Sequence, residues 1–429
     1  MAATSEHEHP RPSVHVVNTV VVHPSPPSSE TSLPLTYYDV FWLRTLPVQR
    51  VFFYRLDAGA DVDVILSNLR ASLSQAISVF FPLAGRLRLA PGTTNRYELH
   101  YRPGDAVTFT VAESDDLDFD ALVAVEPREA AKLAALAPPL PEGGAVLALQ
   151  ATTLNARGCI ALGVTAHHAA CDGAGSTHFL RTWAAFCAGA QPPPIPPVID
   201  DRTIISDPNG LYDFVCPKDK EVNKSLKILP VDDQLLFGTF VLSRTHLQRV
   251  KEAVATEAAA RGVAPPPRCS SLVATLGLVC PPVPDTYLGN CIGGAIAIAS
   301  RADLAAAGGL FTACAAVAAA VEEATRELQV LGACDLWRER VVEAAGMSVL
   351  SVAGSPRFHV YDLDFGFGRP SKVDIVSVAR IGGAVAVAES RVGDGGMEVG
   401  LTLPPDGMDA FRRCFEDAVA GLEMDTGGQ

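Results

Sequence analysis

A proline-rich stretch near the middle of the chain places the strongest constraint on its fold. Gly189–Asp201 contains five prolines, a composition that cannot continue a helix or a central strand. It divides the 429 residues into two portions, each near the usual size of a domain. We therefore predict an N-terminal domain over residues 1–188, a crossover linker over 189–235 and a C-terminal domain over 236–429.

Strand and helix patterns alternate in both portions. Apolar residues at helical spacing predict a helix over Val62–Val79, whereas Val146–Thr153 and Cys159–Ala166 read as two strands joined by a turn. The same patterns predict five further strands, at Val14–His23, Phe237–Ser243, Val373–Ala379, Ala384–Ser390 and Met397–Leu403, and three further helices, at Thr245–Arg261, Leu310–Leu328 and Pro405–Leu422. The predicted fold class is α/β with two similar-sized domains.

Charge and composition argue against several classes of partner. The net charge is −14 and no basic cluster occurs, so we expect no nucleic-acid partner. The apolar run Val14–Val22 is too short and too interrupted to cross a bilayer, so we expect no membrane partner and a cytoplasmic location. The ten cysteines form no C-x-x-C pair, which favours reduced thiols over a zinc site.

The candidate site follows an apolar strand. Residues 165–173 read T-A-H-H-A-A-C-D-G and lie between the predicted strand Cys159–Val164 and a helix over about Ala174–Cys187. Histidine is the usual general base at neutral pH, and a hydroxyl group attacks poorly until its proton is removed. His168 is therefore the candidate base, and Asp172 either orients the loop or caps the helix.

Two other interpretations fit these nine residues. A loop histidine satisfied by local hydrogen bonds, followed by an Asp N-cap, has the same pattern. A metal site built from His167, His168, Cys171 and Asp172 would need four neighbouring side chains to point at one ion, and the sequence offers no distant partner. We expect no metal.

Two motifs in order resemble a known family. H-A-A-C-D-G at residues 168–173 resembles the HxxxDG motif of the plant BAHD acyltransferases, and Y-D-L-D-F-G-F-G-R at 361–369 is similar to their DFGWG signature. Segments 33–39, 80–87 and 287–291 resemble LPLTFFD, FxPLAGRL and YFGNC of the anthocyanin and phenolic glucoside malonyltransferase branch. The resemblance covers roughly Val14–Leu422.

The resemblance implies a fold and a reaction. The fold would be two similar-sized CoA-dependent acyltransferase domains with a channel between them. His168 would take the proton of the acceptor hydroxyl, and the oxygen would attack the thioester of an acyl-CoA, with no acyl-enzyme. Malonyl-CoA is the expected co-substrate and no cofactor is held permanently. A glycosylated phenolic is the expected acceptor, and the protein is expected to be a monomer.

The resemblance also suggests further site residues. Asp364 is a candidate catalytic residue of the second motif, and a purely architectural role beside Gly366 and Gly368 is the alternative. The family's donor-binding region aligns with four residues, namely Lys251, Arg268, Ser270 and Ser271. Hydroxyl groups and a cation suit phosphate and pantetheine, although an ordinary polar helix end would look the same.

The chain departs from the family pattern after Cys280. That pattern continues with a helix and a strand carrying VDCR, whereas Val279–Cys280 here runs directly into Pro281–Pro284. Compared with the family pattern, about 30 residues are absent. They include the arginine that would pair with Asp172. Two alternatives to malonyl transfer therefore stay open: a hydroxycinnamoyl-CoA-dependent acyltransferase of the same family, and a catalytically impaired BAHD-like binding protein.

Overall fold

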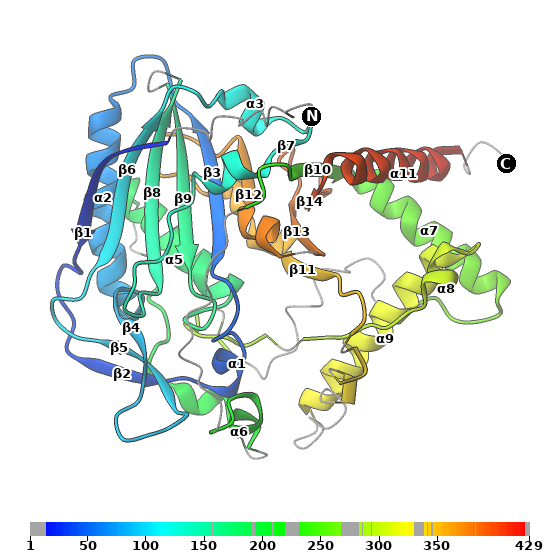
Figure 1. Cartoon of the computed structure of the whole chain (residues 1–429), viewed down its shortest axis with the longest axis horizontal. Coiled ribbons are helices and arrows are strands. Elements are labelled where there is room, and N and C mark those ends of the chain that lie inside the picture. Colours follow the sequence, from blue (N-terminus) through cyan, green and yellow to red (C-terminus); the bar gives the residue numbers. More distant parts are fainter. Residues whose placement is uncertain are drawn as a thin grey trace, which may run out of the picture.

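The structure is a computed structural model. It describes residues 14–155, 158–190, 194–207, 210–218, 231–266, 283–284, 286–292, 294–329, 339–340, 342–344, 346–381 and 383–424. Figure 1 shows one large sheet with α2 and α5 on the left, a second sheet near the centre, and α7, α8, α9 and α11 on the right. The fold is of the α/β class, as predicted.

The large sheet has six strands in the order β1-β6-β8-β9-β3-β12. These strands are β1 (His15–Val22), β3 (Val48–Arg55), β6 (Val107–Ser114), β8 (Leu147–Leu154), β9 (Cys159–Ala166) and β12 (Lys372–Ile375). Only β6 and β8 pair in parallel; the other neighbours are antiparallel. All eight residues of β8 and seven of the eight in β9 are buried, as expected of strands covered on both faces.

A second sheet has the order β11-β13-β14-β10-β7, and a third has the order β2-β5-β4. The strands of the second sheet are β7 (Arg128–Glu129), β10 (Leu236–Leu242), β11 (Ser351–Gly354), β13 (Ala384–Glu389) and β14 (Met397–Leu403); those of the third are β2 (Thr31–Pro34), β4 (Arg86–Leu89) and β5 (Tyr97–Tyr101). Each of the first two sheets contains one strand from the other half of the chain. β12 joins the N-terminal strands of the first sheet, and β7 pairs with β10 in the second.

The helices are α1 (Tyr37–Val40), α2 (Val62–Val79), α3 (Phe119–Val123), α4 (Ala130–Ala134), α5 (Gly173–Cys187), α6 (Leu211–Val215), α7 (Arg244–Ala260), α8 (Arg301–Ala305), α9 (Gly309–Gln329) and α11 (Pro405–Met424). α2 and α5 pack together on one face of the six-stranded sheet (Figure 1). The indole N–H of Trp183 on α5 donates to the carbonyl of Leu69 on α2 at 3.0 Å. α3 and α4 contribute to a second core on the opposite face, together with Phe237 and Ala386 of the second sheet.

Most of the predicted elements are confirmed within a few residues. The helix Val62–Val79 has the predicted bounds. The strand predicted over Val373–Ala379 is wrong beyond Ile375, because Val376–Arg380 forms a 3₁₀ turn instead. A short apolar run does not distinguish a strand from a buried turn. The expectation of reduced thiols is also wrong at one position, since Cys291 is disulfide-bonded.

Candidate active site

The loop that carries His168 joins the end of β9 to the start of α5. β9 ends at Ala166, and Asp172 is the N-cap of α5, with Oδ1 accepting a hydrogen bond from the Gly175 N–H at 2.9 Å. The buried strand fixes one end of this loop and the capped helix fixes the other. His168 therefore lies on a loop that is held at both ends by a rigid element, as a catalytic group requires.

Asp172 also holds a segment from far along the sequence. Its Oδ2 accepts from the N–H of Cys291 at 3.2 Å, and its own N–H donates to the carbonyl of Gly289 at 3.1 Å. Among the described residues no ion pair reaches Asp172, and burial raises the pKa of its carboxyl. This arrangement agrees with the expectation that Asp172 orients the loop and with the absence of the arginine expected from the family pattern.

The His168 imidazole is held on one face and at one nitrogen. The ring stacks on Trp42, with centroids 3.8 Å apart and planes inclined by 17°. Its Nδ1 lies 3.0 Å from Oδ1 of Asn290. The two rings come from segments far apart in the sequence, so this contact comes from the tertiary structure.

Asn290 connects His168 to a buried carboxylate. Its Nδ2 donates to Oδ1 of Asp39 at 2.9 Å and to the carbonyl of His168 at 2.8 Å. Both amide protons are therefore used, which leaves the Asn290 Oδ1 to accept a hydrogen bond from the Nδ1–H of the imidazole. Asp39 in turn forms an ion pair with Arg202 Nη1 at 3.6 Å.

This chain of contacts fixes the tautomer of His168. Burial lowers the pKa of the imidazole to about 4, with smaller contributions from the hydrogen bond to Asn290, which raises it, and from the charge of Arg50, which lowers it. The ring is consequently neutral at pH 7. Nδ1 carries the proton of the neutral ring and donates it in the hydrogen bond to Asn290. Nε2 therefore keeps its lone pair and can accept a proton from a substrate hydroxyl.

The neighbouring residues do not compete for this role. Burial also lowers the pKa of His167 to about 4, but its Nδ1 accepts a hydrogen bond from the Ala169 N–H at 3.2 Å and does not reach Asn290. Burial raises the pKa of the Cys171 thiol to about 12. A thiol of that kind is a poor nucleophile, as expected of a reaction without an acyl-enzyme.

The remaining predicted residues lie apart from His168 or outside the described residues. Asp364 is exposed, and its Oδ1 accepts from the N–H groups of Gly366 at 2.7 Å and Gly368 at 3.0 Å. Both glycines have positive φ angles, 94° and 102°, so the carboxylate closes a turn that favours glycine. Lys251 lies half-buried on α7. Arg268, Ser270 and Ser271 fall outside the described residues.

Sequence reasoning missed three contributors to the site, Asn290, Asp39 and Arg202. Asn290 and Asp39 lie in segments that resemble the family, but only folding brings the three residues together, across 122 residues for His168 and Asn290. One local signal was available. A Cβ at Gly289 would lie 2.3 Å from Nη1 of Arg202, so glycine in the segment Y-L-G-N marks close packing against this arginine.

Two further observations limit the chemistry. Within the described ranges, no group of three or more His, Cys, Asp or Glu side chains could hold a metal ion. The helices in those ranges are also not long and apolar enough to cross a membrane.

The fold is α/β, and the histidine loop lies between a buried strand and a capped helix. The comparisons with known proteins place this chain in a class, the transferases of two-domain α/β fold. The family model named Transferase family matches residues 12–276 and 270–418. The chain is 34% identical over 457 residues to phenolic glucoside malonyltransferase 1 of Arabidopsis thaliana, with 93% of this chain and 96% of that protein covered. The chain belongs to this family, the BAHD acyltransferases, and is an acyltransferase.

Other relatives differ in the donor that their names state. The chain is 35% identical to malonyl-CoA:anthocyanidin 5-O-glucoside-6''-O-malonyltransferase of Arabidopsis thaliana, with 94% of this chain and 97% of that protein covered. It is 28% identical to coumaroyl-CoA:anthocyanidin 3-O-glucoside-6''-O-coumaroyltransferase 2 of the same plant, with 92% and 96% covered. The crystal structure of vinorine synthase matches with a TM-score of 0.61 at 19% identity, covering 92% of this chain and 96% of that one. That likeness confirms the predicted two-domain fold.

Proposed function

We propose that this acyltransferase moves a malonyl group from malonyl-CoA to a sugar hydroxyl of a phenolic or flavonoid glucoside, with His168 as the general base. The observation that carries the proposal is the neutral imidazole, whose Nδ1 is held by Asn290 and whose Nε2 is left to accept a proton. The relatives of highest identity mentioned above are named as malonyltransferases of phenolic and anthocyanidin glucosides.

The reaction would proceed by direct attack. Nε2 of His168 removes the proton of the acceptor hydroxyl while the oxygen attacks the thioester carbonyl. The tetrahedral oxyanion then collapses, the carbon–sulfur bond breaks, and the thiolate of coenzyme A takes up a proton. Holding both substrates between the two domains makes the attack effectively unimolecular. Asp172 would keep the histidine loop joined to residues 289–291, and Asn290 would orient the ring.

Several finer points belong to the same proposal. Lys251, Arg268, Ser270 and Ser271 would contact the donor, and Asp364 would shape its turn rather than touch substrate. The domain limits at residues 188 and 236, the monomeric state and the cytoplasmic location remain predictions. The coumaroyl donor stays as the second candidate, because relatives named as coumaroyltransferases match at 28% identity over 92% of the chain.

The impaired-protein alternative depends on the segment absent after Cys280. The family model matches in two pieces that meet at residues 270–276, close to that point. A coding stretch of about 90 nucleotides between the codons for Cys280 and Pro281 would mean that the present sequence lacks an exon. Amplifying this interval from genomic DNA and from transcripts tests that explanation.

The central experiment measures thiol release by the purified protein. Malonyl-CoA, coumaroyl-CoA and acetyl-CoA are each supplied with a flavonoid glucoside or its aglycone, and products are identified by mass. We expect release with malonyl-CoA and the glucoside, and a decrease of about 10²- to 10⁴-fold in His168→Ala. His167→Gln is the matched control and should keep its activity. A folded protein that releases thiol from no donor would instead be the impaired paralogue.

A further inference from the structure

Arg50 is a buried cation with unused hydrogen-bonding capacity. It lies on β3, is 7% exposed, and its side chain occupies the face of the sheet that α5 covers. Nη1 donates to Oγ1 of Thr177 at a long 3.4 Å, and the guanidinium lies 5.7 Å from the ring centre of Phe358. No described residue accepts a hydrogen bond from Nε or Nη2.

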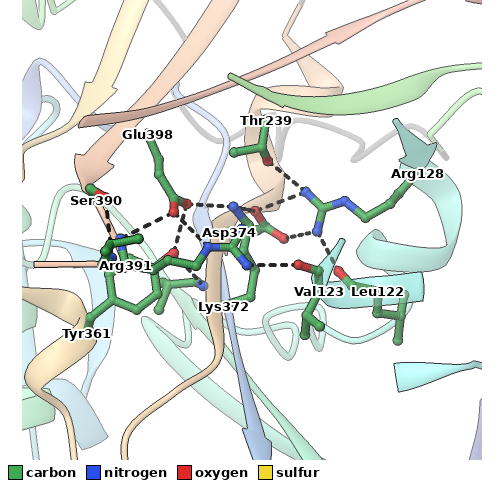
Figure 2. Close-up of polar contacts among 12 residues, drawn as sticks. Leu122, Val123, Arg128, Thr239, Tyr361, Lys372, Asp374, Ser390, Arg391 and Glu398 are labelled. Atoms are coloured by element: carbon green, nitrogen blue, oxygen red, sulfur yellow. Dashed lines mark hydrogen bonds and ion pairs between the residues drawn. The ribbon is translucent and has the colours of Figure 1, made fainter. Parts of the chain in front are cut away.

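Two carboxylates that line one cavity together with Arg50, those of Asp374 and Glu398, are already neutralised by other cations. Figure 2 shows Asp374 held by Arg128, and Glu398 held by Lys372 and Arg391. The Arg128–Asp374 and Lys372–Glu398 contacts are both 2.6 Å and almost completely buried. Three cations therefore serve two carboxylates in this network, and Arg50 adds a further positive charge.

Asp172 does not compensate Arg50 either. Its two oxygens accept from the backbone N–H groups of Gly175 and Cys291, and no ion pair within 4.0 Å joins it to Arg50 among the described residues. Burial lowers the pKa of the guanidinium, against the weaker raising influence of Cys171 and Asp172. An arginine this deep without a carboxylate partner costs free energy, and such costs are typical of functional sites.

A small cavity adjoins the guanidinium. It has a volume of about 30 Å³ and is bounded by Arg50, Ser355, Phe358, Val360 and Val373, among others. Its walls are mainly apolar, so a charge interaction there would be only weakly screened. A cavity of this volume holds about two water-sized groups, which is enough for the two oxygens of a carboxylate.

We propose that Arg50 and this cavity form a binding site for a carboxylate carried by one of the two reactants. With Nη1 turned toward Thr177, the Nε and Nη2 donors lie on one edge of the guanidinium, the edge that binds carboxylates in a bidentate manner. Arg50 pairs with Val164 on β9 and contacts Thr177 on α5, and these two elements hold the loop of His168. The inference rests on the proposed acyltransferase activity, and it deepens that activity by giving the chemical class of the group selected.

Two sources of the carboxylate are compatible with this site. In a malonyl donor, one methylene separates the carboxylate from the thioester carbonyl. Alternatively, an acidic acceptor, such as a glucoside that already carries a carboxylate, would place its charge there. Both use the same chemistry, and the arms of one experiment distinguish them.

The test compares the wild-type protein with Arg50→Met. In the donor arm, malonyl-CoA and acetyl-CoA compete for a neutral glucoside; in the acceptor arm, carboxylated and neutral glucosides compete for acetyl-CoA. We expect Arg50→Met to lower kcat/KM for the carboxylated partner of one arm by on the order of 100-fold, and for its neutral counterpart far less. Arg55→Met, an exposed arginine on the same strand, is the control. Unchanged selectivity in both arms overturns the proposal.

A binding measurement separates this proposal from the proposed activity. Calorimetry with sodium malonate and with malonyl-CoA should detect binding to the wild-type protein that Arg50→Met weakens, whether or not thiol is released. If activity is absent but this difference persists, the carboxylate site stands without the proposed reaction. If both proteins bind equally, or neither binds, the site is wrong. Arg50→Gln serves as a second variant if the Met variant does not fold.

Discussion

The six-stranded sheet and the C-terminal helices bury very different fractions of their residues. β8 and β9 are buried almost throughout, and α5 buries seven of its 15 residues. By contrast, α7 buries two of 17 and α8 none. Apolar side chains are exposed in the segment before β11: Val342, Met347, Val349 and Leu350. Apolar residues recur in both regions. They form a closed core around the six-stranded sheet, whereas many of them lie exposed in the C-terminal region.

This difference separates a region whose apolar residues are covered from a region whose apolar residues are exposed. His168, the proposed general base, lies in the closed region, and the C-terminal portion of the chain supplies Asn290 through a short segment. The exposed apolar run lies in the same portion as Cys280, after which we expect about 30 residues of the family pattern to be absent. An apolar pattern stabilises a fold only where a partner covers it, so we expect the closed region to dominate stability.

Acid should destabilise the closed region first. Burial lowers the pKa of His167 and His168 from 6.5 to about 4, so the unfolded chain binds more protons between these values. Stability therefore falls as the pH is lowered from about 6.5 to about 4, by on the order of 3 kcal/mol for each imidazole. The raised pKa of Asp172 offsets part of this loss. Urea unfolding at several pH values, followed by tryptophan fluorescence, should give this slope, and His167→Gln should reduce it. Equal stability at pH 6.5 and 4.5 would contradict the prediction.

Removing the buried ion pair that joins the six-stranded sheet to the second sheet should have the next largest effect. Arg128 lies between β10 and the carboxylate of Asp374 on β12 (Figure 2). Arg128→Met leaves that carboxylate without its bidentate partner, and we expect a loss of about 3–5 kcal/mol in the free energy of unfolding. The exposed pair Arg55–Asp120 is the control, because Arg55→Met should cost below about 1 kcal/mol. Similar losses in the two variants would contradict the buried role.

Matched leucine substitutions test the comparison directly. Leu162 on β9 is fully buried, whereas Leu350 is 69% exposed. Leu162→Ala should lower the free energy of unfolding by about 2–5 kcal/mol through the cavity it leaves, and Leu350→Ala by below about 0.5 kcal/mol. Denaturant unfolding measures both. A large cost at Leu350 would mean that another surface covers this position in solution.

The smallest expected effect concerns Asn290, the side chain from the C-terminal portion that contacts the imidazole of His168. Asn290→Ala removes the acceptor of the Nδ1 proton, and we expect kcat to fall roughly 10- to 100-fold with little change in KM, as for partners that orient metal-bound histidines. Adding this substitution to His168→Ala should cause no further loss, because the two residues act as one unit. A further loss in the double variant would show that Asn290 acts independently.

Much of the fold followed from local patterns. The helix Val62–Val79 was predictable because apolar residues recur at its period. His168 as the base stays a prediction, because the local motif left a satisfied loop histidine open and only the family resemblance favoured the catalytic role. Asp172 was predictable as a helix cap because it lies just before the predicted helix. The strand over Val373–Ala379 was only partly correct, because the turn after Ile375 depends on burial against the second sheet.

The sequence by itself determined the fold class, most element boundaries, the family and the loop that carries His168, since each is encoded by neighbouring residues. Tertiary structure decided that Asn290 and Asp39 would hold the imidazole, that β12 would join the N-terminal sheet, and that Arg50 would be left without a carboxylate. These facts depend on which side chains meet across more than a hundred residues. Strand register and burial determine these long-range side-chain contacts, and local propensity carries no information about them.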